Sequence, residues 1–428
     1  MPLRLASLAF ACAVALSCAA TSAAQDADVA VPPTPAVGAA STELPADRVT
    51  ATLADYQRWL DELAARDGTA GLATAVVIDD KVVFERTLGY ADVATQTPVT
   101  PDTVFRLASL SKAFASALTG LLVDRHDLHW HTRLVDVLPD FRLKDTADTD
   151  AATVADVLGQ RLGLPNNAYD NLLEAGVPYA DLIARLAEVD PICAPGACYG
   201  YENVAFSLIG NVLAARLGKT FPQLVKHNLF QPLGMRDASY GLDGLESSPS
   251  WARPHRAAGN GWLSFTPNET YYQLAPAAGV NASIRDMERW LIAQMGGRRN
   301  VLPANLLERL HTPDVVTPSE LHASPWRRAR LSAAHYALGW RVYTYGGETL
   351  IYHAGAVAGY RTMIGFFPRY RAGVVTLWNA NGAMPSGLMP MVFDGLLGLP
   401  HVDWAGLESP PVASIAPAHT ASHKHHGS

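Results

Sequence analysis

The sequence predicts an α/β fold of the α+β type, with one antiparallel sheet from N- and C-terminal strands, flanking helices and an inserted all-helical lobe. Two observations lead to this prediction. Strand-like runs occur at residues 72–88 and again at residues 336–378, whereas residues 103–310 are rich in helical patterns. Strands from both ends of a domain can share one sheet, so we expect two lobes in a single folded unit.

The first predicted element is a helix over residues 50–66, in which apolar side chains recur at helical spacing. Two strands follow at residues 72–79 and 81–88, and an aspartate pair forms the turn that joins them. Residues 113–123 are apolar on nearly every face, which is typical of a helix buried in the middle of a domain. Further strands are expected at residues 336–345, 349–354, 359–367 and 372–378.

The composition argues against a nucleic-acid partner. The 428 residues carry a net charge of −7, an isoelectric point near 6.0 and only six lysines. Binding to nucleic acid depends on basic side chains that neutralise phosphates, and no basic stripe is visible. With 49% hydrophobic residues, the chain can instead bury a large core.

Residues 1–24 have the pattern of a signal peptide. An apolar run follows Arg4, and small residues precede a cleavage site near Ala24. The run is too short to span a bilayer, so we expect no transmembrane segment in the mature chain and a periplasmic or secreted protein. Lipid attachment at Cys18 is a less favoured alternative, because Ala15 stands where lipoproteins usually have leucine.

The remaining chain divides by composition into three parts. A proline-containing stretch predicts a disordered linker over residues 25–48, and the folded domain is expected over residues 49–400. Residues 401–428 form a tail that contains several histidines among small and polar residues. Such a composition cannot bury a core, so we expect the tail to be disordered.

Ser109 and Lys112 form a Ser-x-x-Lys motif, and Lys112 is the only lysine with a serine three residues before it. Residues three apart share one face of a helix, which brings the amine close to the hydroxyl. A free lysine has a pKa of about 10.4, so a lysine that acts as a base at neutral pH needs a pKa about three units lower. The apolar helix that follows predicts a buried Lys112, and burial lowers the pKa of an amine. The pair therefore indicates a covalent serine hydrolase.

Tyr201 and Asn203 form a Tyr-x-Asn motif directly before a helical apolar run at residues 204–213. Asn203 is also suited to cap that helix, which is compatible with catalysis. A rival triplet begins at Tyr169, but it lies in a turn-rich loop with no long apolar helix behind it. We therefore prefer Tyr201.

A third motif, His-Ala-Gly, begins at His353 and lies between two strand-like runs. A small residue followed by Gly355 lets a substrate backbone lie beside the edge of the strand. The competing His-His-Gly at residues 425–427 lies in the polar tail, where no fold is expected.

With these three motifs in order, the chain resembles the serine beta-lactamase and penicillin-binding protein superfamily. The similarity covers roughly residues 50–400 and indicates the branch of class C beta-lactamases, D-alanyl-D-alanine carboxypeptidases, D-aminopeptidases and related esterases. Supporting stretches lie at residues 104–108, 229–235, 277–280, 283–287 and 336–340. The resemblance implies a beta-lactamase-like serine hydrolase domain whose active site lies between the sheet edge and the helical lobe.

The resemblance also implies catalytic roles. Ser109 would be the acylated nucleophile, Lys112 its proton partner, and Tyr201 the second base and the acid for the leaving group. Backbone N–H groups of Ser109 and Ala356 would form the oxyanion hole, at roughly 3–4 kcal/mol per donor. No cofactor and no metal are implied, and the histidines at residues 126–131 fit a solvated loop.

Among substrate-binding residues, Asn203 would hydrogen-bond the substrate amide, and His353, Gly355 and Ala356 would line the site. Class C beta-lactamases have lysine at the position of His353, and their His-Thr-Ser-Gly-Leu loop is replaced here by residues 160–164. Histidine has a pKa of about 6.5. If His353 binds the substrate carboxylate as a cation, carboxylate-bearing substrates should bind less tightly as the pH rises through that value.

The implied function is an exported serine hydrolase that acts through a serine acyl-enzyme on amide or ester bonds. Its partner would be a small-molecule or peptide substrate: a beta-lactam, a D-amino-acid peptide or an ester. A promiscuous carboxylesterase and a penicillin-binding or peptidoglycan-fragment-binding protein without turnover are the alternatives. We expect a monomer.

Cys193 and Cys198 are the only cysteines beyond the predicted signal peptide. In an oxidising compartment, this pair predicts a disulfide that closes a short loop and stabilises the fold by about 2 kcal/mol. The loop ends just before Tyr201. The disulfide either positions the Tyr-x-Asn segment or only stabilises the fold without an effect on activity.

Overall fold

The computed structural model describes residues 42–259 and 261–408, and within these residues nine strands form one antiparallel sheet. Strands β1 and β14 pair along their length, so the sheet joins the two ends of the domain. This confirms the predicted fold class. In spatial order the strands are β3 (Thr97–Pro98), β2 (Lys81–Asp92), β1 (Gly71–Ile78), β14 (Ala372–Trp378), β13 (Tyr360–Phe367), β12 (Glu348–Val357), β11 (Arg341–Tyr345), β10 (Leu331–Tyr336) and β9 (Val315–Val316).

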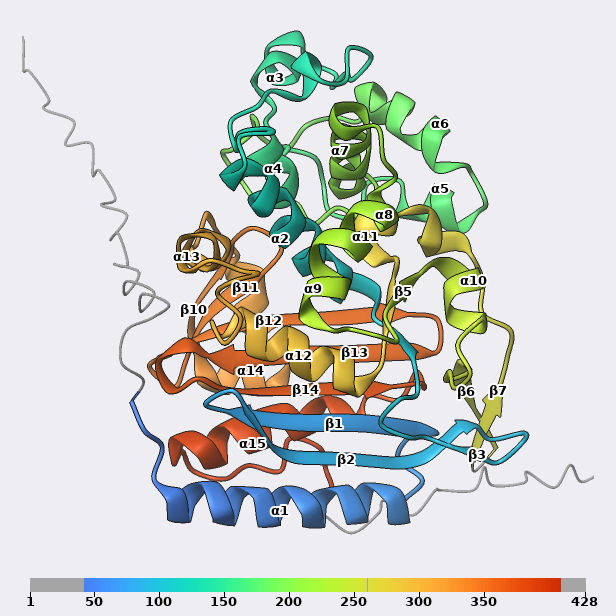
Figure 1. Cartoon of the computed structure of the whole chain (residues 1–428), viewed down its shortest axis with the longest axis vertical. Coiled ribbons are helices and arrows are strands. Elements are labelled where there is room, and N and C mark those ends of the chain that lie inside the picture. The colour runs from blue at the N-terminus through green and yellow to red at the C-terminus, as the bar shows by residue number, and fades with distance from the viewer. Residues whose placement is uncertain (1–41, 260, 409–428) are drawn as a thin grey trace, which may run out of the picture. The chain divides into compact units, whose positions relative to one another are not determined.

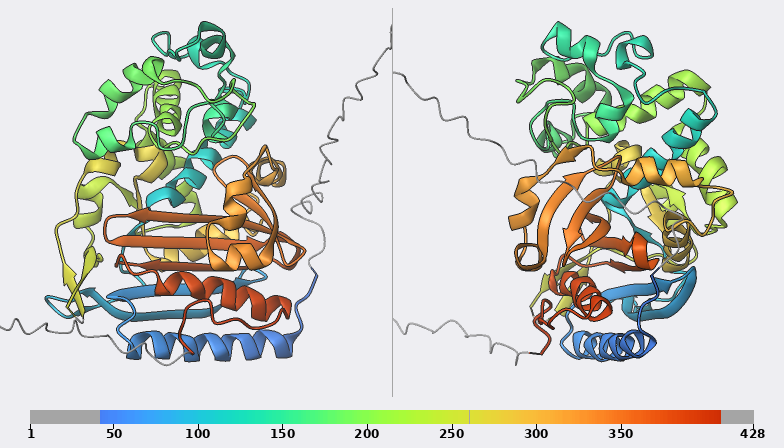
Figure 2. Two further views of the ribbon diagram at one scale, coloured as in Figure 1. Left: turned by 180° about the vertical axis from the view of Figure 1, so that it is seen from behind. Right: turned by 90° about the vertical axis from the view of Figure 1, so that its left-hand side faces the viewer.

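Helices cover both faces of the sheet, which explains why its central strands are apolar on both sides. Helices α1 (Ala46–Ala65) and α15 (Leu388–Leu397) lie together on one face (Figure 2). Helix α12 (Ile284–Gln294) packs on the other face. Along β1, Leu72 and Val76 belong to the first layer, whereas Ala73, Ala75 and Val77 belong to the second.

The helical lobe is inserted between β2 and the C-terminal strands and lies above the sheet in Figure 1. Its first helix, α2, is buried along nearly its whole length, as the apolar sequence predicts. The lobe and its connection to the sheet contain α2 (Ser111–Asp124), α3 (Thr146–Ala151), α4 (Val154–Leu158), α5 (Asp170–Glu174), α6 (Tyr179–Ala184), α7 (Leu208–Leu217), α8 (Phe221–Val225), α9 (Gln231–Leu233), α10 (Gly241–Glu246) and α11 (Ala275–Ala278).

Smaller elements complete the fold. Strands β4 (Phe105–Arg106), β8 (Val280–Ala282) and β5 (Ser239–Tyr240) form a small sheet directly before the Ser-x-x-Lys segment. Strands β6 (His255–Ala258) and β7 (Gly261–Ser264) form a hairpin. Helices α13 (Ala304–His311) and α14 (Pro325–Arg330) precede β10.

The single strand predicted at residues 336–345 is wrong, because the chain reverses direction within it. Strand β10 ends at Tyr336 and β11 begins at Arg341, with a hydrogen bond of 2.8 Å from the Ala337 N–H to the Trp340 carbonyl. Gly339 adopts a left-handed φ of +72° in this turn, and a Cβ there would lie 2.7 Å from the Lys112 carbonyl oxygen. The turn is therefore packed tightly against α2, where only glycine fits.

The ordered domain extends beyond its predicted C-terminal boundary at residue 400. The Trp404 indole donates a hydrogen bond of 2.9 Å to Asp394, and Leu407 is buried. Residues 401–408 therefore belong to the domain rather than to the tail. The predicted signal peptide, residues 25–41 of the predicted linker and the tail from residue 409 lie outside the described residues. The linker does not extend to residue 48 as predicted, because Leu44 is buried and α1 begins at Ala46.

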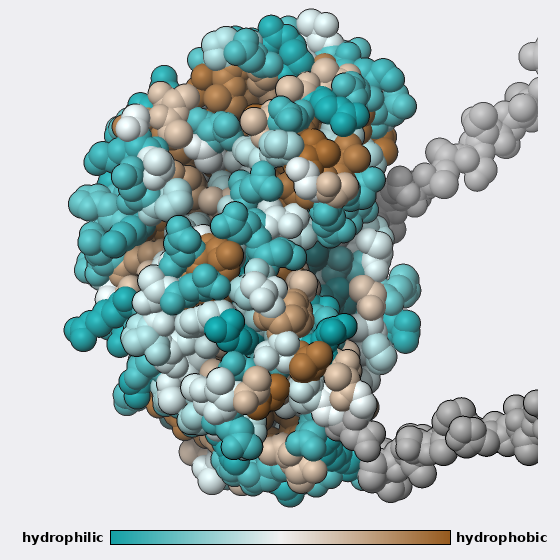
Figure 3. All heavy atoms as spheres, turned by 90° about the vertical axis from the view of Figure 1, so that its right-hand side faces the viewer, coloured by the Kyte–Doolittle hydropathy of each residue, from teal (hydrophilic) through white to brown (hydrophobic). Residues whose placement is uncertain are grey.

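Exposed apolar side chains are few and scattered. On the face in Figure 3, hydrophobic residues form small separate groups among hydrophilic ones. The large apolar residues that are exposed within the described chain are Val82, Val83, Tyr90, Ile192, Leu263 and Val316. None of the described helices is both long and apolar enough to cross a membrane.

Candidate active site

Ser109 lies in a one-turn 3-10 helix, Ala108–Leu110, directly before α2. Ala108 has a φ of +49°, a left-handed conformation that is uncommon for residues other than glycine. The Ser111 hydroxyl fixes the turn, since it donates a 2.6 Å hydrogen bond to the Ala108 carbonyl and accepts a 3.0 Å bond from the Val280 N–H. The turn thus holds the Ser109 hydroxyl at the wall of a pocket.

Lys112 is fully buried one turn further along the chain, as predicted. Its amine lies 3.2 Å from the Ser109 hydroxyl oxygen, 2.6 Å from the Asn203 side-chain oxygen and 3.3 Å from the Ala277 carbonyl oxygen. As an ammonium, Lys112 can donate to all three oxygens. As a neutral amine, it can donate to Asn203 and Ala277 and turn its lone pair toward the Ser109 hydroxyl.

Burial lowers the pKa of Lys112 to about 7. The carboxylate of Asp170 opposes this effect and raises the pKa, while the positive charge of Arg341 lowers it further. The lowered pKa brings the neutral amine, the form that can accept a proton, within reach near neutral pH. Lys112 therefore has the position and the lowered pKa that a base for Ser109 would need, and its role as that base stays a prediction.

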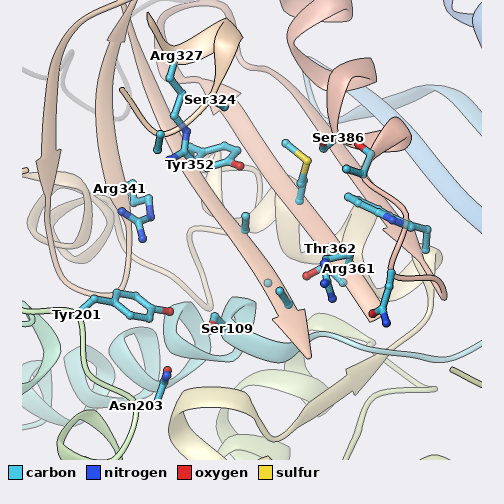
Figure 4. Close-up of a pocket in the computed structure, with 18 of the residues that line it drawn as sticks. Ser109, Tyr201, Asn203, Ser324, Arg327, Arg341, Tyr352, Arg361, Thr362 and Ser386 are labelled. Atoms are coloured by element: carbon cyan, nitrogen blue, oxygen red, sulfur yellow. Dashed lines mark hydrogen bonds between the residues drawn. The ribbon is translucent and has the colours of Figure 1, made fainter. Parts of the chain in front are cut away.

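The Tyr201 hydroxyl points toward Ser109 (Figure 4). Burial raises the pKa of Tyr201 to about 12, although Arg341 and a hydrogen bond with Ser109 both lower it. Its ring also lies near the Lys112 amine, which is 4.6 Å from the ring centroid. At neutral pH Tyr201 therefore carries its proton and can act as a donor beside the nucleophile.

The segment that carries Tyr201 is held in place by the loop at residues 160–166. The Gln160 side chain accepts a 2.8 Å hydrogen bond from the Glu202 N–H and donates a 3.1 Å bond to the Glu202 carbonyl. The Asn166 side-chain oxygen accepts a 2.6 Å bond from the Tyr201 N–H. Gln160 thus clamps the backbone between Tyr201 and Asn203.

Cys193 and Cys198 form a disulfide, as predicted. Two hydrogen bonds of 2.8 Å join the disulfide loop to the loop at residues 160–166. They run from the Ile192 N–H to the Gly163 carbonyl and from the Gly196 N–H to the Arg161 carbonyl. The disulfide loop therefore supports the same segment whose Gln160 clamps the Tyr-x-Asn backbone. An effect on activity stays a prediction.

Asn203 connects Lys112 to Asp170, a residue of the rival triplet. Its side-chain amide donates a 2.6 Å hydrogen bond to Asp170, while its oxygen accepts from Lys112. Tyr169, in contrast, donates its hydroxyl proton to the Arg185 carbonyl at 2.9 Å. The structure therefore brings Tyr201 to Ser109 and leaves Tyr169 elsewhere. It also places Asp170, which no sequence motif indicated as a site residue, beside the site.

Strand β12 lies against the turn that contains Ser109. A Cβ on Gly355 would be 2.3 Å from the Leu107 carbonyl oxygen and 3.1 Å from the Ser109 nitrogen, so no larger residue fits. Ala356 is exposed and lines the same pocket as Ser109. The proposed oxyanion role of their N–H groups stays a prediction.

The prediction that His353 binds a carboxylate as a cation is wrong. The predicted loss of carboxylate binding as His353 loses its proton is therefore wrong as well. His353 is 1% exposed, and its Nδ1 lies 2.8 Å from the Ala354 carbonyl oxygen, so Nδ1 donates and Nε2 accepts from the Tyr336 hydroxyl at 3.3 Å. Burial, with the charges of Arg341 and Lys112, holds the pKa of His353 well below its usual value. His353 is therefore neutral and packs behind the site.

Two arginines that no sequence motif indicated provide positive charge at the pocket. Arg341 on β11 and Arg327 on α14 both line it (Figure 4), and both pair with Glu320. Arg341 lies 2.6 Å from Glu320 and 5.4 Å from the centroid of the Tyr201 ring. Two cations share one carboxylate, so this wall of the pocket keeps a net positive charge.

The pocket has a volume of about 730 Å³, within the range of small-molecule sites. It is lined by Ser109, Tyr201, Asn203 and Ala356 together with side chains of β13 and β14. No group of three or more His, Cys, Asp or Glu side chains suited to a metal ion occurs among residues 42–259 and 261–408.

Residues 57–390 match the model of the beta-lactamase family. The chain is 26% identical to unguisins hydrolase ungD of Aspergillus violaceofuscus, with 82% of this chain and 65% of that protein covered, slightly less than two thirds of its length. It is 25% identical to penicillin-binding protein 4 of Amycolatopsis lactamdurans, with 84% and 92% covered. The fold is similar to that of the octameric penicillin-binding protein homologue from Pyrococcus abyssi, with a TM-score of 0.72, 21% identity and coverage of 81% and 77%. The protein therefore belongs to the beta-lactamase family, whose members are serine hydrolases.

Proposed function

We propose that the protein is an exported hydrolase that forms an acyl-enzyme on Ser109 with small amide or ester substrates. One observation carries this proposal: the Ser109 hydroxyl oxygen lies 3.2 Å from a buried lysine amine whose pKa is about 7. The neighbouring Tyr201 hydroxyl is protonated at neutral pH. The proposed base, Lys112, and the proposed acid, Tyr201, therefore both lie beside the proposed nucleophile, the Ser109 hydroxyl oxygen.

The proposed acylation begins when neutral Lys112 accepts the Ser109 proton while the serine oxygen attacks the substrate carbonyl carbon. The developing oxyanion would accept hydrogen bonds from the N–H groups of Ser109 and Ala356. Tyr201 then gives its proton to the leaving nitrogen or oxygen, and the acyl–leaving-group bond breaks. The Lys112 ammonium restores the tyrosine proton, so both residues return to their starting forms. Hydrolysis repeats these proton transfers with water as the nucleophile.

The positive wall supports a substrate whose leaving group carries a carboxylate. Arg341 lies over the ring of Tyr201, the proposed donor to the leaving group, and arginine is charged at all working pH values. Beta-lactams and peptides that end in a D-amino acid have this chemistry. The similarity to a penicillin-binding protein supports beta-lactams as substrates, and the similarity to an unguisins hydrolase supports hydrolysis as the reaction.

A carboxylesterase is a second candidate, because Ala354 stands where the Lys-Thr-Gly motif of the family has threonine. This side chain lines the pocket without the hydroxyl that would help to hold a carboxylate. A simple ester needs only the nucleophile and the open pocket. Hydrolysis of p-nitrophenyl acetate without acylation by any carboxylate-bearing amide would favour this candidate.

Intact-protein mass spectrometry after addition of benzylpenicillin tests the proposal, with Ser109→Ala as the matched control. An adduct that needs Ser109 and persists would indicate a penicillin-binding protein without rapid turnover. An adduct that decays while penicilloate accumulates would indicate a beta-lactamase. If benzylpenicillin, D-amino-acid amides and p-nitrophenyl esters all leave the protein unmodified and are not hydrolysed, the proposed function is wrong.

A further inference from the structure

One wall of the active-site pocket carries two carboxylates on a single helix turn. Asp170 and Glu174 are four residues apart on α5, so they project from the same face, and both line the pocket. Like charges at this spacing repel each other. Within residues 42–259 and 261–408, neither carboxylate forms an ion pair with a basic side chain, unlike Glu320 on the opposite wall.

Only one of the two carboxylate oxygens of Asp170 has a hydrogen-bond partner within the described chain. Asp170 is 9% exposed, and one of its oxygens accepts the hydrogen bond from Asn203 while the other, Oδ1, is buried and has no partner within the described chain. Tyr271 lies next to both carboxylates, but its single hydroxyl proton goes to Glu174 at 2.8 Å. An unpaired buried oxygen of this kind is suited to a hydrogen-bond donor supplied by a ligand.

We propose that Asp170, Glu174 and Tyr271 form a subsite for a primary ammonium group on the acyl side of the substrate. An ammonium has three N–H donors, and this wall provides two carboxylates and one hydroxyl oxygen. The inference rests on the proposed function and narrows it to substrates that carry a free amine. D-amino-acid amides, peptides with a free N-terminus and amine-bearing beta-lactams belong to this class.

The position of the subsite follows from its neighbours. Asp170 is bonded to Asn203, whereas the positive wall stands over Tyr201, the proposed donor to the leaving group. Figure 4 shows Arg341 and Asn203 on opposite sides of the line from Tyr201 to Ser109. A substrate with a carboxylate on its leaving group and an ammonium on its acyl group would match both walls, and the reverse orientation would meet like charge at both.

Two pairs of substrates isolate the ammonium group. Ampicillin and benzylpenicillin differ by one amine on the acyl side chain, and D-alanine p-nitroanilide differs from its N-acetyl derivative by a blocked amine. We expect kcat/KM, or the acylation rate constant where turnover is slow, to be roughly tenfold or more higher for the amine-bearing member of each pair. The preference should fall as the pH rises past the amine pKa, about 7.7–8.0 for an α-amino group.

Glu174→Gln is the main variant, because Glu174 is exposed and lies outside the catalytic residues. It should reduce the preference severalfold, chiefly by lowering the rate with the amine-bearing member of each pair. Glu188→Gln is the matched control, since Glu188 lies in the same lobe outside the pocket and should leave the preference unchanged. Melting temperatures of both variants exclude misfolding as the cause.

Equal rates within both pairs, or a preference that survives Glu174→Gln, would overturn the ammonium subsite. The proposed function would stand in that case, because Ser109 would still be acylated. If neither member of either pair acylates Ser109 while simple esters do, the ammonium subsite fails and the esterase candidate gains. If no substrate modifies Ser109, both proposals fail together.

Discussion

The Lys112 amine lies 3.2 Å from the Ser109 hydroxyl oxygen and has no exposed surface. Burial lowers the pKa of Lys112 to about 7, so the amine is charged below this pH and neutral above it. Only the neutral form can accept the serine proton. The protonation state of one buried side chain should therefore govern acylation.

We expect the rate of acylation by p-nitrophenyl acetate, which has no titrating group, to rise with pH through a midpoint near 7. Lys112→Arg should reduce this rate by roughly 10²–10⁴-fold, because arginine keeps its proton and cannot act as a base. Stopped-flow measurement of p-nitrophenol release between pH 5.5 and 9.5 checks both expectations. A rate that is still rising steeply at pH 9.5, as expected for a free lysine with a pKa of about 10.4, would contradict the role of a desolvated base.

Asp170→Asn should shift the same midpoint to lower pH. The Asp170 carboxylate raises the pKa of Lys112, so its removal lets burial lower that pKa further. The substitution also weakens the hydrogen bond that orients the Asn203 amide, so the maximal rate should fall. Glu174→Gln on the same helix leaves that hydrogen bond intact and serves as the control. A lower rate with an unchanged midpoint would mean that Asp170 orients Asn203 but does not affect the pKa of Lys112.

Arg341→Gln should weaken the binding of substrates with a carboxylate on the leaving group. Arg327 can still pair with Glu320, so the wall loses its net positive charge without leaving an isolated carboxylate. We expect the KM for a D-alanyl-D-alanine peptide to rise roughly tenfold, with little change for p-nitrophenyl acetate. Arg299→Gln, an exposed residue outside the pocket, is the control. An equal rise in KM for both substrates would contradict carboxylate recognition by Arg341.

The paired change Cys193→Ser and Cys198→Ser should lower the free energy of unfolding by about 2 kcal/mol. Because the disulfide loop is bonded to the segment that holds Tyr201, we also expect kcat/KM to fall severalfold. Urea unfolding and steady-state kinetics on the same samples separate the two effects. A loss of stability with unchanged kcat/KM would show that the disulfide is only a staple.

The central part of the sheet was predictable because strands such as β1, β13 and β14 are long apolar runs bounded by turn residues. The helix behind Ser109 was predictable for a similar reason, since its sequence is apolar on all faces. The strand predicted at residues 336–345 failed where Gly339 makes a turn inside an apolar run. The local sequence pattern does not distinguish this turn from a continuous strand. The turn is imposed by the packing of Gly339 against α2, which lies far away in the sequence.

The site was predicted only in part, because some contacts join distant segments. Asp170 meets Asn203 across 33 residues of sequence, and Arg341 reaches the pocket through the register of β11 on β12. The charge state of His353 depends on the cover provided by Tyr336 and Tyr201, which no pattern around His353 reveals. Motifs predicted which residues lie together, and tertiary packing decided which of them are charged.

The most direct test of the central claim is to locate the covalent adduct. Wild-type protein is incubated with benzylpenicillin, D-alanine p-nitroanilide or p-nitrophenyl acetate, quenched in acid, digested and sequenced by tandem mass spectrometry. We predict that the acyl group is on Ser109 and that Ser109→Ala gives neither adduct nor turnover. An acyl group on another residue, or turnover that survives Ser109→Ala, would contradict the assignment of Ser109 as the nucleophile.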